Sequence, residues 1–438
     1  MSALEQLGEF IVGYRPDTRV REAVRLHVAD TIGAWIAGAA SSEGRALTAH
    51  RARVGQGVRD DIATHCACTR LSEVDDIHLA AMITPGAIVV PAALTIAASR
   101  DIAVDDLIAA IAGGYEAMVR LGVAIDGPSV LYRGIWPTYF AAPFGVAAVA
   151  ARLLRLDATK TAHALAAALI MAAPGTGHHA APTTARWLAI GHNAGRGLDA
   201  AQAAQSGFTS DLRLAEGELL RSIYGITPNV AALDDGLGEL AVHQVSFKPW
   251  CAARQTMAAT QALKEIVADG IRPEAITEID VAALPPHLKM IGHGVTAGDR
   301  FSHLTSAPYN MAVAVLAPDA AYEISGPSGA IAPALQAFMA RIKVRADDSL
   351  LQDGYPKIWP ANVTVTTASG RHVRRVDHVP GDPARCYGEA ELKAKFMRLV
   401  TPVAGSRAEA MFALALNALD RSSDAVAELS KIITPARH

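Results

Sequence analysis

Apolar residues recur at three- and four-residue intervals from about Arg19 to Leu263, with breaks at Gly and Pro clusters, as in helices buried on one face. Val20–Ala40 is predicted to be one buried helix, on which small residues such as Gly38 permit close contact with a neighbouring helix. The most apolar stretches, 140–154 and 161–173, are Ala-rich and shorter than a membrane span. We therefore expect a bundle of buried core helices in this part of the chain.

The pattern changes after residue 263. Segments 276–281 and 363–366 alternate apolar and polar residues, as half-buried strands do. Ser369-Gly370 separates the second segment from a third, 372–376, and this spacing predicts a hairpin. A helix is expected between the strands, at 306–316. The mixture of helix and strand predicts a smaller α+β domain.

Helical spacing returns near the C-terminus, at 391–400 and 408–419. These helices are expected to pack back on the first domain, which would make the α+β part an insertion. The predicted fold is therefore mostly α with an α+β insertion. Residues 1–263 with 393–438 are assigned to a large all-helical domain, and 264–392 to the smaller α+β domain.

The composition is that of a well-packed globular protein, with 51% hydrophobic and 19% charged residues in 438. The net charge is -3 and no block of Lys or Arg is present, which argues against nucleic-acid binding. The first twelve residues contain Glu5 and Glu9 and lack the basic and apolar regions of a secretory signal. We expect a cytoplasmic protein without a membrane span.

Four cysteines are present, at positions 66, 68, 251 and 386. They are too few for a disulfide framework, and their spacing fits neither a zinc site nor an iron–sulfur cluster. No metal site or cofactor is predicted, so the chemistry is expected to come from side chains.

Several short motifs follow one another along the chain. They are Glu73-Val74-Asp75-Asp76 with His78, Thr84-Pro85-Gly86, Gly134-Ile135-Trp136-Pro137-Thr138, the stretch from Arg186 to Gly191, and Lys248-Pro249-Trp250. In this order and spacing they resemble the MmgE/PrpD family, which includes 2-methylcitrate dehydratases, cis-aconitate decarboxylases and iminodisuccinate epimerases. The resemblance implies a large all-α domain with a smaller α+β lid, an active site in the cleft between them, a homodimer, and chemistry without metal or organic cofactor.

The chain departs from the family pattern at three histidine positions, which are Thr84, Trp136 and Met257 here. None of the three side chains can take a proton at neutral pH, so the family mechanism cannot be transferred unchanged. Trp136 and Met257 would also make a pocket more apolar, and the substrate is then expected to be less anionic than a tricarboxylate.

Five residues are the candidates for catalysis: Asp75, Asp76, His78, Tyr139 and Lys248. Neighbouring carboxylates shift one another's pKa and can divide into an acid and a base. The alternative is that the carboxylates stabilise a helix N-terminus. Tyr139 is a candidate phenolic acid, and Lys248 is a candidate contact for an anion. Neither Asp76 nor His78 is expected to be a packing residue.

The candidates for substrate binding are Arg186, Trp136, Thr84, Met257, His178, His179, His192 and His303. Arg186 stands where the family has a lysine, and its guanidinium suits bidentate binding of a carboxylate rather than proton transfer. The histidines could supply the lost acid and base groups, or could be hydrogen-bonded structural residues. His303, Ser306 and Tyr309 lie in a segment that resembles the lid motif of the family.

Together these features predict a cofactor-independent lyase, of the dehydratase or decarboxylase type, that removes a proton next to a carboxyl or carbonyl group of a small carboxylic acid. Two alternatives stay open. One is an isomerase or epimerase of a small carboxylate. The other is a non-catalytic homologue that binds a small acid or a partner, because scaffold and site can vary independently.

Overall fold

The computed structural model describes the chain except for residues 56, 174–182, 235–237, 327–328, 421–427 and 429–438. The described residues divide into two compact units. The larger unit takes those of Met1–His178, Thr184–Ser246 and Gly388–His438, and the smaller takes Thr183 and Phe247–Tyr387.

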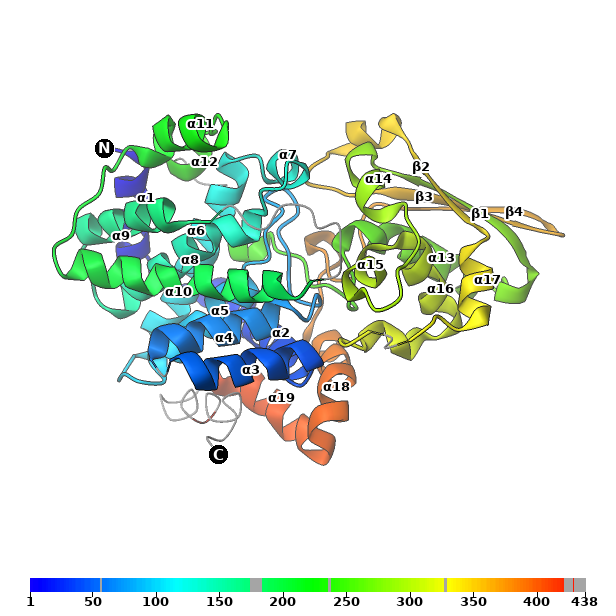
Figure 1. Cartoon of the computed structure of the whole chain (residues 1–438), viewed down its shortest axis with the longest axis horizontal. Coiled ribbons are helices and arrows are strands. Elements are labelled where there is room, and N and C mark those ends of the chain that lie inside the picture. The colour runs from blue at the N-terminus through cyan, green and yellow to red at the C-terminus, as the bar shows by residue number, and fades with distance from the viewer. Residues whose placement is uncertain (56, 174–182, 235–237, 327–328, 421–427, 429–438) are drawn as a thin grey trace. The chain divides into compact units, whose positions relative to one another are not determined.

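The larger unit is helical (Figure 1). Its α-helices are α1 (Ala3–Gly13), α2 (Thr18–Ala39), α3 (Ser42–Val54), α4 (Val58–Arg70), α5 (Gly86–Ala97), α6 (Val104–Ala124), α7 (Gly127–Tyr132), α8 (Pro137–Leu153), α9 (Ala158–Met171), α10 (Ala185–Gln205), α11 (Glu218–Tyr224), α12 (Ala231–Asp234), α18 (Glu389–Ala404) and α19 (Ala408–Asn417). A short 3-10 helix, η2, covers Ala241–His243.

Side-chain caps fix where several of these helices begin. The Asp17 carboxylate accepts the Val20 N–H at the start of α2, and Asp157 does the same for Lys160 at the start of α9. Helix α10 packs against α4, α8 and α9, and α8 packs against α6. The predicted close approach at Gly38 is confirmed, because a Cβ there would lie 2.0 Å from the Cys68 carbonyl oxygen of α4.

The smaller unit combines helices with one four-stranded sheet. Its elements are α13 (Met257–Ala268), β1 (Ile276–Ala283), α14 (Pro285–Ile291), α15 (Arg300–Thr305), α16 (Ala307–Leu316), α17 (Pro333–Met339), β2 (Ile342–Ala346), β3 (Ala361–Thr367) and β4 (Gly370–Val376). The strand order is β2-β1-β3-β4. Strands β1 and β2 are parallel, whereas β1–β3 and β3–β4 are antiparallel.

The predicted fold class is confirmed, and so are β1, the β3–β4 hairpin and helix α16. Strand β2 was not predicted although Ile-Lys-Val-Arg-Ala alternates apolar and polar residues, because its partner is the parallel strand β1, distant in sequence, and no hairpin marks the segment. Valines from β1 and β3, such as Val281 and Val363, have side chains in an apolar core that also contains residues of α13 and α16.

The boundaries between the units differ from those expected at 263/264 and 392/393. The division lies at Ser246/Phe247 and at Tyr387/Gly388. Helix α13 continues the helical pattern of the first half of the chain, but it packs on β3, β4 and α16. Spacing along the sequence could not reveal which core this helix joins. The terminal helices α18 and α19 do pack on α2, as expected.

Two helical runs among the described residues are long and apolar enough to cross a membrane by length and composition alone. The first is α6, in whose most apolar 18-residue window 94% of the residues are buried, so it acts as a core helix. The second spans Glu389–Asp420, and Gly405, with a φ of 57°, interrupts it between α18 and α19.

Two buried histidines predict how stability depends on pH. Burial, with a nearby arginine in each case, lowers the pKa of His65 and of His287 from 6.5 to about 3. Each stays neutral when folded but takes up a proton when unfolded, so its contribution is complete above pH 6.5 and is lost as pH falls toward 3. Each histidine should then lower the free energy of unfolding by about 1.4 kcal/mol per pH unit in this window.

Urea unfolding from pH 7 to 4 measures this effect, and tryptophan fluorescence reports on it because Trp35 contacts His65 and Trp359 contacts His287. His65→Gln and His287→Gln should each flatten the pH dependence, whereas the exposed His50→Gln should not. If the free energy of unfolding depends equally on pH in all three variants, His65 and His287 are not the source of this pH dependence.

Candidate active site

The Asp76 carboxylate lies in the loop between α4 and α5 and is completely buried. Its Oδ1 accepts the Gly86 N–H at 2.8 Å, and its Oδ2 accepts the Tyr115 hydroxyl at 2.6 Å. The Nδ1 atom of His27, from α2, lies 2.8 Å from the same Oδ2. Asp76 therefore holds the first residue of α5 and is a packed residue, contrary to the expectation that it is not.

The neighbouring carboxylates form a second buried group around Arg70, the last residue of α4. Its Nη1 lies 3.0 Å from Glu73 Oε2 and 3.2 Å from Asp75 Oδ1. Burial acts to lower the pKa of Arg70, but Asp75 and Glu73 outweigh it and the pKa is raised. Glu73 adopts a left-handed backbone with φ of 56°, which an L-residue other than Gly seldom adopts. The ion pairs hold this strained loop in place.

His78 is buried, and its tautomer follows from one contact. Its Nδ1 accepts the Ala81 N–H at 3.1 Å, so the hydrogen of the neutral ring is on Nε2. In this form His78 can donate a hydrogen bond from Nε2 but cannot accept one there. Like Asp76, His78 is a packed residue rather than a surface one.

The Thr84-Pro85-Gly86 turn is joined to the start of α8. The Thr84 N–H donates to Thr138 Oγ1 at 3.0 Å, and the two hydroxyl oxygens are 3.2 Å apart. The next residue along α8 is Tyr139, whose side chain is buried. Two motifs that are about 50 residues apart in the sequence therefore meet.

Arg186 and Tyr139 form a third group at the start of α10 and α8. The Arg186 Nε–H donates to the Tyr139 hydroxyl oxygen at 3.3 Å. The guanidinium carbon lies 4.4 Å from the ring centre of Trp136 and 4.9 Å from that of Trp187. Arg186 thus makes cation–π contacts with two indole rings. Tyr139 also interacts electrostatically with Arg70. This group therefore neighbours the group of Arg70, Glu73 and Asp75.

The chain was compared with known protein families. Residues 5–220 match the MmgE/PrpD N-terminal domain, and residues 250–421 match the MmgE/PrpD C-terminal domain. The chain belongs to the MmgE/PrpD family. Members of this family are lyases or dehydratases of small carboxylic acids. No curated protein matches the chain.

The larger unit of this MmgE/PrpD protein contains most of the predicted site residues. Asp75, Thr84, Trp136, Tyr139 and Arg186 belong to the linked groups described above, around the start of α8. His178 and His179 lie outside the described residues. His192 lies apart from these groups, on α10.

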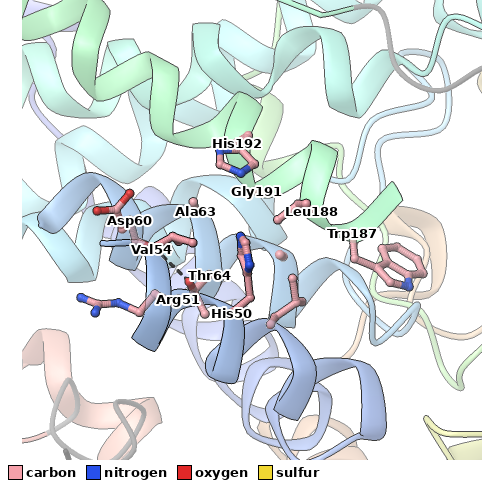
Figure 2. A pocket seen from close by; sticks show the side chains of 12 residues that line it. His50, Arg51, Val54, Asp60, Ala63, Thr64, Trp187, Leu188, Gly191 and His192 are labelled. Carbon is pink, nitrogen blue, oxygen red and sulfur yellow. Dashed lines mark hydrogen bonds between the residues drawn. The ribbon is translucent and has the colours of Figure 1, made fainter. Parts of the chain in front are cut away.

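His192 lines a small surface cavity with His50 of α3 and Trp187 (Figure 2). Burial, with Arg59 nearby, lowers the pKa of His192. An adjoining cavity of about 370 Å³ is also lined by His50 and Trp187. Residues of α3, α4 and α10 line this cavity, and Tyr139 is not among them. The role of His192 in substrate binding stays a prediction.

The smaller unit of the MmgE/PrpD protein contains the other predicted residues. Lys248 is 1% exposed, near the start of this unit. Met257 is fully buried in the apolar core, so the structure gives it a packing role. His303 is buried, its Nδ1 donates to the Asp299 carbonyl oxygen at 2.8 Å, and it lines a small cavity with Tyr309. Among the described residues, no group of three or more His, Cys, Asp or Glu side chains could hold a metal ion.

Five residues that complete these groups were not among the predicted site residues: His27, Arg70, Tyr115, Thr138 and Trp187. Of these, Thr138 and Trp187 lie inside the motifs that carried the family resemblance. His27 and Arg70 gave a usable signal, because a histidine on a buried helix and an arginine three residues before Glu73 both need polar partners. Tyr115 and Trp187 read as ordinary core aromatics, and only the fold brings them to Asp76 and Arg186.

The contact between Gly86 and Asp76 gives a stability prediction. A Cβ at position 86 would lie 2.7 Å from both Asp76 carboxylate oxygens and from the Tyr115 hydroxyl. Gly86→Ala should therefore destabilise the protein by about 1–3 kcal/mol, as overpacking does. Gly113→Ala on α6 is the control, because its Cβ would meet only Ile11 at 3.7 Å and Ala favours helix. Thermal unfolding compares the two, and equal melting temperatures would refute the steric argument.

Proposed function

We propose that the protein is a cofactor-independent lyase of a small carboxylic acid, with its acid group in the Tyr139–Arg186 pair. The observation that carries the proposal is the hydrogen bond from Arg186 Nε to the Tyr139 oxygen, which is buried, with two indole rings in contact with the guanidinium. Because the Tyr139 oxygen accepts a hydrogen bond from the Arg186 guanidinium, the hydroxyl hydrogen of Tyr139 can be donated to another acceptor. A phenolate formed after proton donation would be stabilised by Arg186.

Asp75 is proposed as the base. Its carboxylate is paired with Arg70, which also interacts with Tyr139. In an elimination, Asp75 would take the proton from the carbon next to the substrate carboxylate, and that C–H electron pair would form the C=C bond. The C–O bond would break, and the hydroxyl would leave as water with the proton of Tyr139. Water would then return a proton to Tyr139 and take one from Asp75.

Asp76 and His78 take supporting roles in this proposal. Asp76 accepts several hydrogen bonds within the core and so holds the turn at Gly86. His78 carries its hydrogen on Nε2 and can act only as a donor there. Trp136 and Thr84, in place of the histidines of the family pattern, leave Tyr139 as the proton donor at the start of α8. Lys248 and His303 stay predicted substrate contacts, and the homodimer and cytoplasmic location stay predictions.

A thermal-shift screen of small hydroxy, keto and amino acids tests the proposal, because a ligand that binds the folded state raises its melting temperature. Acids that bind would then be assayed for double-bond formation, loss of carbon dioxide and change of configuration. The proposal expects one of the first two. A change of configuration alone would favour an isomerase, and binding without any reaction would favour a non-catalytic homologue.

2-Methylcitrate, the substrate of the methylcitrate dehydratases, is expected to be a poor substrate for this protein. Trp136 fills space next to Arg186 and Tyr139 with an apolar ring, which disfavours a tricarboxylate. The protein should therefore show no measurable dehydration of 2-methylcitrate in a direct absorbance assay. Turnover within the range usual for enzymes, roughly 1–1000 per second, would contradict the inference from Trp136.

A further inference from the structure

His27 lies in the core of the larger unit, and its two ring nitrogens meet different partners. Nε2 is 3.1 Å from the Val242 carbonyl oxygen, in η2. A carbonyl oxygen only accepts hydrogen bonds, so Nε2 carries a hydrogen. Nδ1 is 2.8 Å from Asp76 Oδ2. Two lone pairs at that distance would repel, so one further hydrogen lies between His27 and Asp76.

The surroundings of Asp76 supply a hydrogen-bond donor to each of its carboxylate oxygens. The Gly86 N–H and the Tyr115 O–H both donate to it. Gly86 begins the 12-residue helix α5, whose N-terminus stabilises negative charge. Burial first, and then the charge of Asp76, raises the pKa of Tyr115 well above 10, so the phenol keeps its hydrogen and must donate.

The charge balance of the core points the same way. Lys395, from α18, lies 2.6 Å from Asp30 Oδ1 and donates to the Val74 carbonyl oxygen at 2.9 Å. Burial raises the pKa of Asp30, an effect that Lys395 opposes, and Asp30 also interacts electrostatically with Asp76 and His27. Lys395 is thus paired with Asp30, and a protonated His27 would supply the positive charge that faces Asp76.

We infer that His27 is a positioning residue of the candidate active site, a buried imidazolium that holds Asp76 and, through Asp76, the turn at Thr84–Gly86. Asp76 accepts a hydrogen bond from the Gly86 N–H. Thr84, two residues before Gly86 in the same turn, donates its N–H to the Thr138 hydroxyl oxygen. Thr138 precedes Tyr139, so His27 sets where the Tyr139 hydroxyl lies. This inference rests on the proposed function only where it treats Tyr139 as a catalytic residue.

Nuclear magnetic resonance of the full chain tests the inference without a substrate. In protein labelled with ¹⁵N-histidine, the signal absent from His27→Gln identifies His27 among the 15 histidines. The wild type should show a hydrogen on both ring nitrogens near neutral pH. Asp76→Asn should leave a hydrogen on Nε2 alone, because the amide N–H can donate to a neutral Nδ1. A single ring N–H in the wild type would overturn the imidazolium.

A second label tests the positioning. In protein with ¹³C at the tyrosine Cζ carbons, Tyr139→Phe identifies the Tyr139 signal among the nine tyrosines. His27→Gln should shift the Tyr139 signal and leave that of Tyr224 unchanged, at a temperature where the variant is folded. A purely structural role would lower stability without moving the Tyr139 signal. If His27→Gln does not fold, Asp76→Asn serves for the same comparison, and an unmoved Tyr139 signal overturns the positioning role.

The two experiments separate this inference from the proposed function. The His27 and Tyr139 signals are both measured on the protein without substrate, so their outcome does not depend on catalysis. Failure of the proposed function would appear in the reaction assays, for example as full activity in Tyr139→Phe, and would leave both signals unchanged.

Discussion

Tyr139→Phe is expected to lower turnover of the cognate acid by roughly 10²–10⁴-fold, the usual contribution of a general acid. The substitution keeps the ring, which contacts Trp136, and removes only the hydroxyl that accepts from Arg186. Substrate affinity should change less than turnover, because the proton is transferred only in the transition state. The measurement is steady-state kinetics with an acid found by the ligand screen.

Tyr224→Phe is the matched control. Its hydroxyl donates to the Ala172 carbonyl oxygen, away from Arg186, and its ring packs on Phe140 in a T-shaped contact. Turnover of this variant should stay near that of the wild type. Wild-type turnover in Tyr139→Phe, with the variant shown to be folded by circular dichroism, would remove Tyr139 from the mechanism.

Asp76→Ala is expected to cost about 3–5 kcal/mol of stability, as breaking a buried ion pair does. The change would leave the Gly86 N–H, the Tyr115 hydroxyl and His27 without their common acceptor in the core. Asp76→Asn should cost less, because an amide oxygen can still accept from Gly86 and an amide N–H can face a neutral His27. Urea unfolding of the full chain measures both.

Asp199→Ala is the control for this comparison. Asp199 pairs with Arg59 at 2.6 Å, but both side chains are about one third exposed, so the loss should stay below about 1 kcal/mol. Equal stabilities of Asp76→Ala and Asp199→Ala would show that the Asp76 network is not a structural element.

The sequence was sufficient for the fold class because helices and strands leave different periodicities. The β3–β4 hairpin was predicted because Val363 and Val365 alternate with threonines before a Ser-Gly turn. Helix α13 was placed in the wrong unit because an apolar helical face looks the same whichever core it joins. Strand β2 was missed because it pairs in parallel with the distant strand β1, so no hairpin turn marks it in the sequence.

The candidate site was predictable only in part. The motifs gave Asp75, Tyr139 and Arg186, but they could not distinguish a carboxylate that can react from one filled by hydrogen bonds, as Asp76 is. That distinction depends on Tyr115 and His27, which lie 39 and 49 residues from Asp76 in sequence. Met257 shows the same limit, because its expected place in a substrate pocket did not reveal that its side chain packs in a core.

Solvent deuterium incorporation tests the central claim most directly. The protein would be incubated in deuterated water with each acid that raises its melting temperature, and the hydrogen next to the carboxylate would be followed by proton magnetic resonance. We predict that the wild type removes or exchanges this hydrogen in at least one acid, and that Asp75→Asn and Tyr139→Phe do so far more slowly. If acids bind but this hydrogen is retained at the rate seen without protein, the side chains of this site do not catalyse proton transfer.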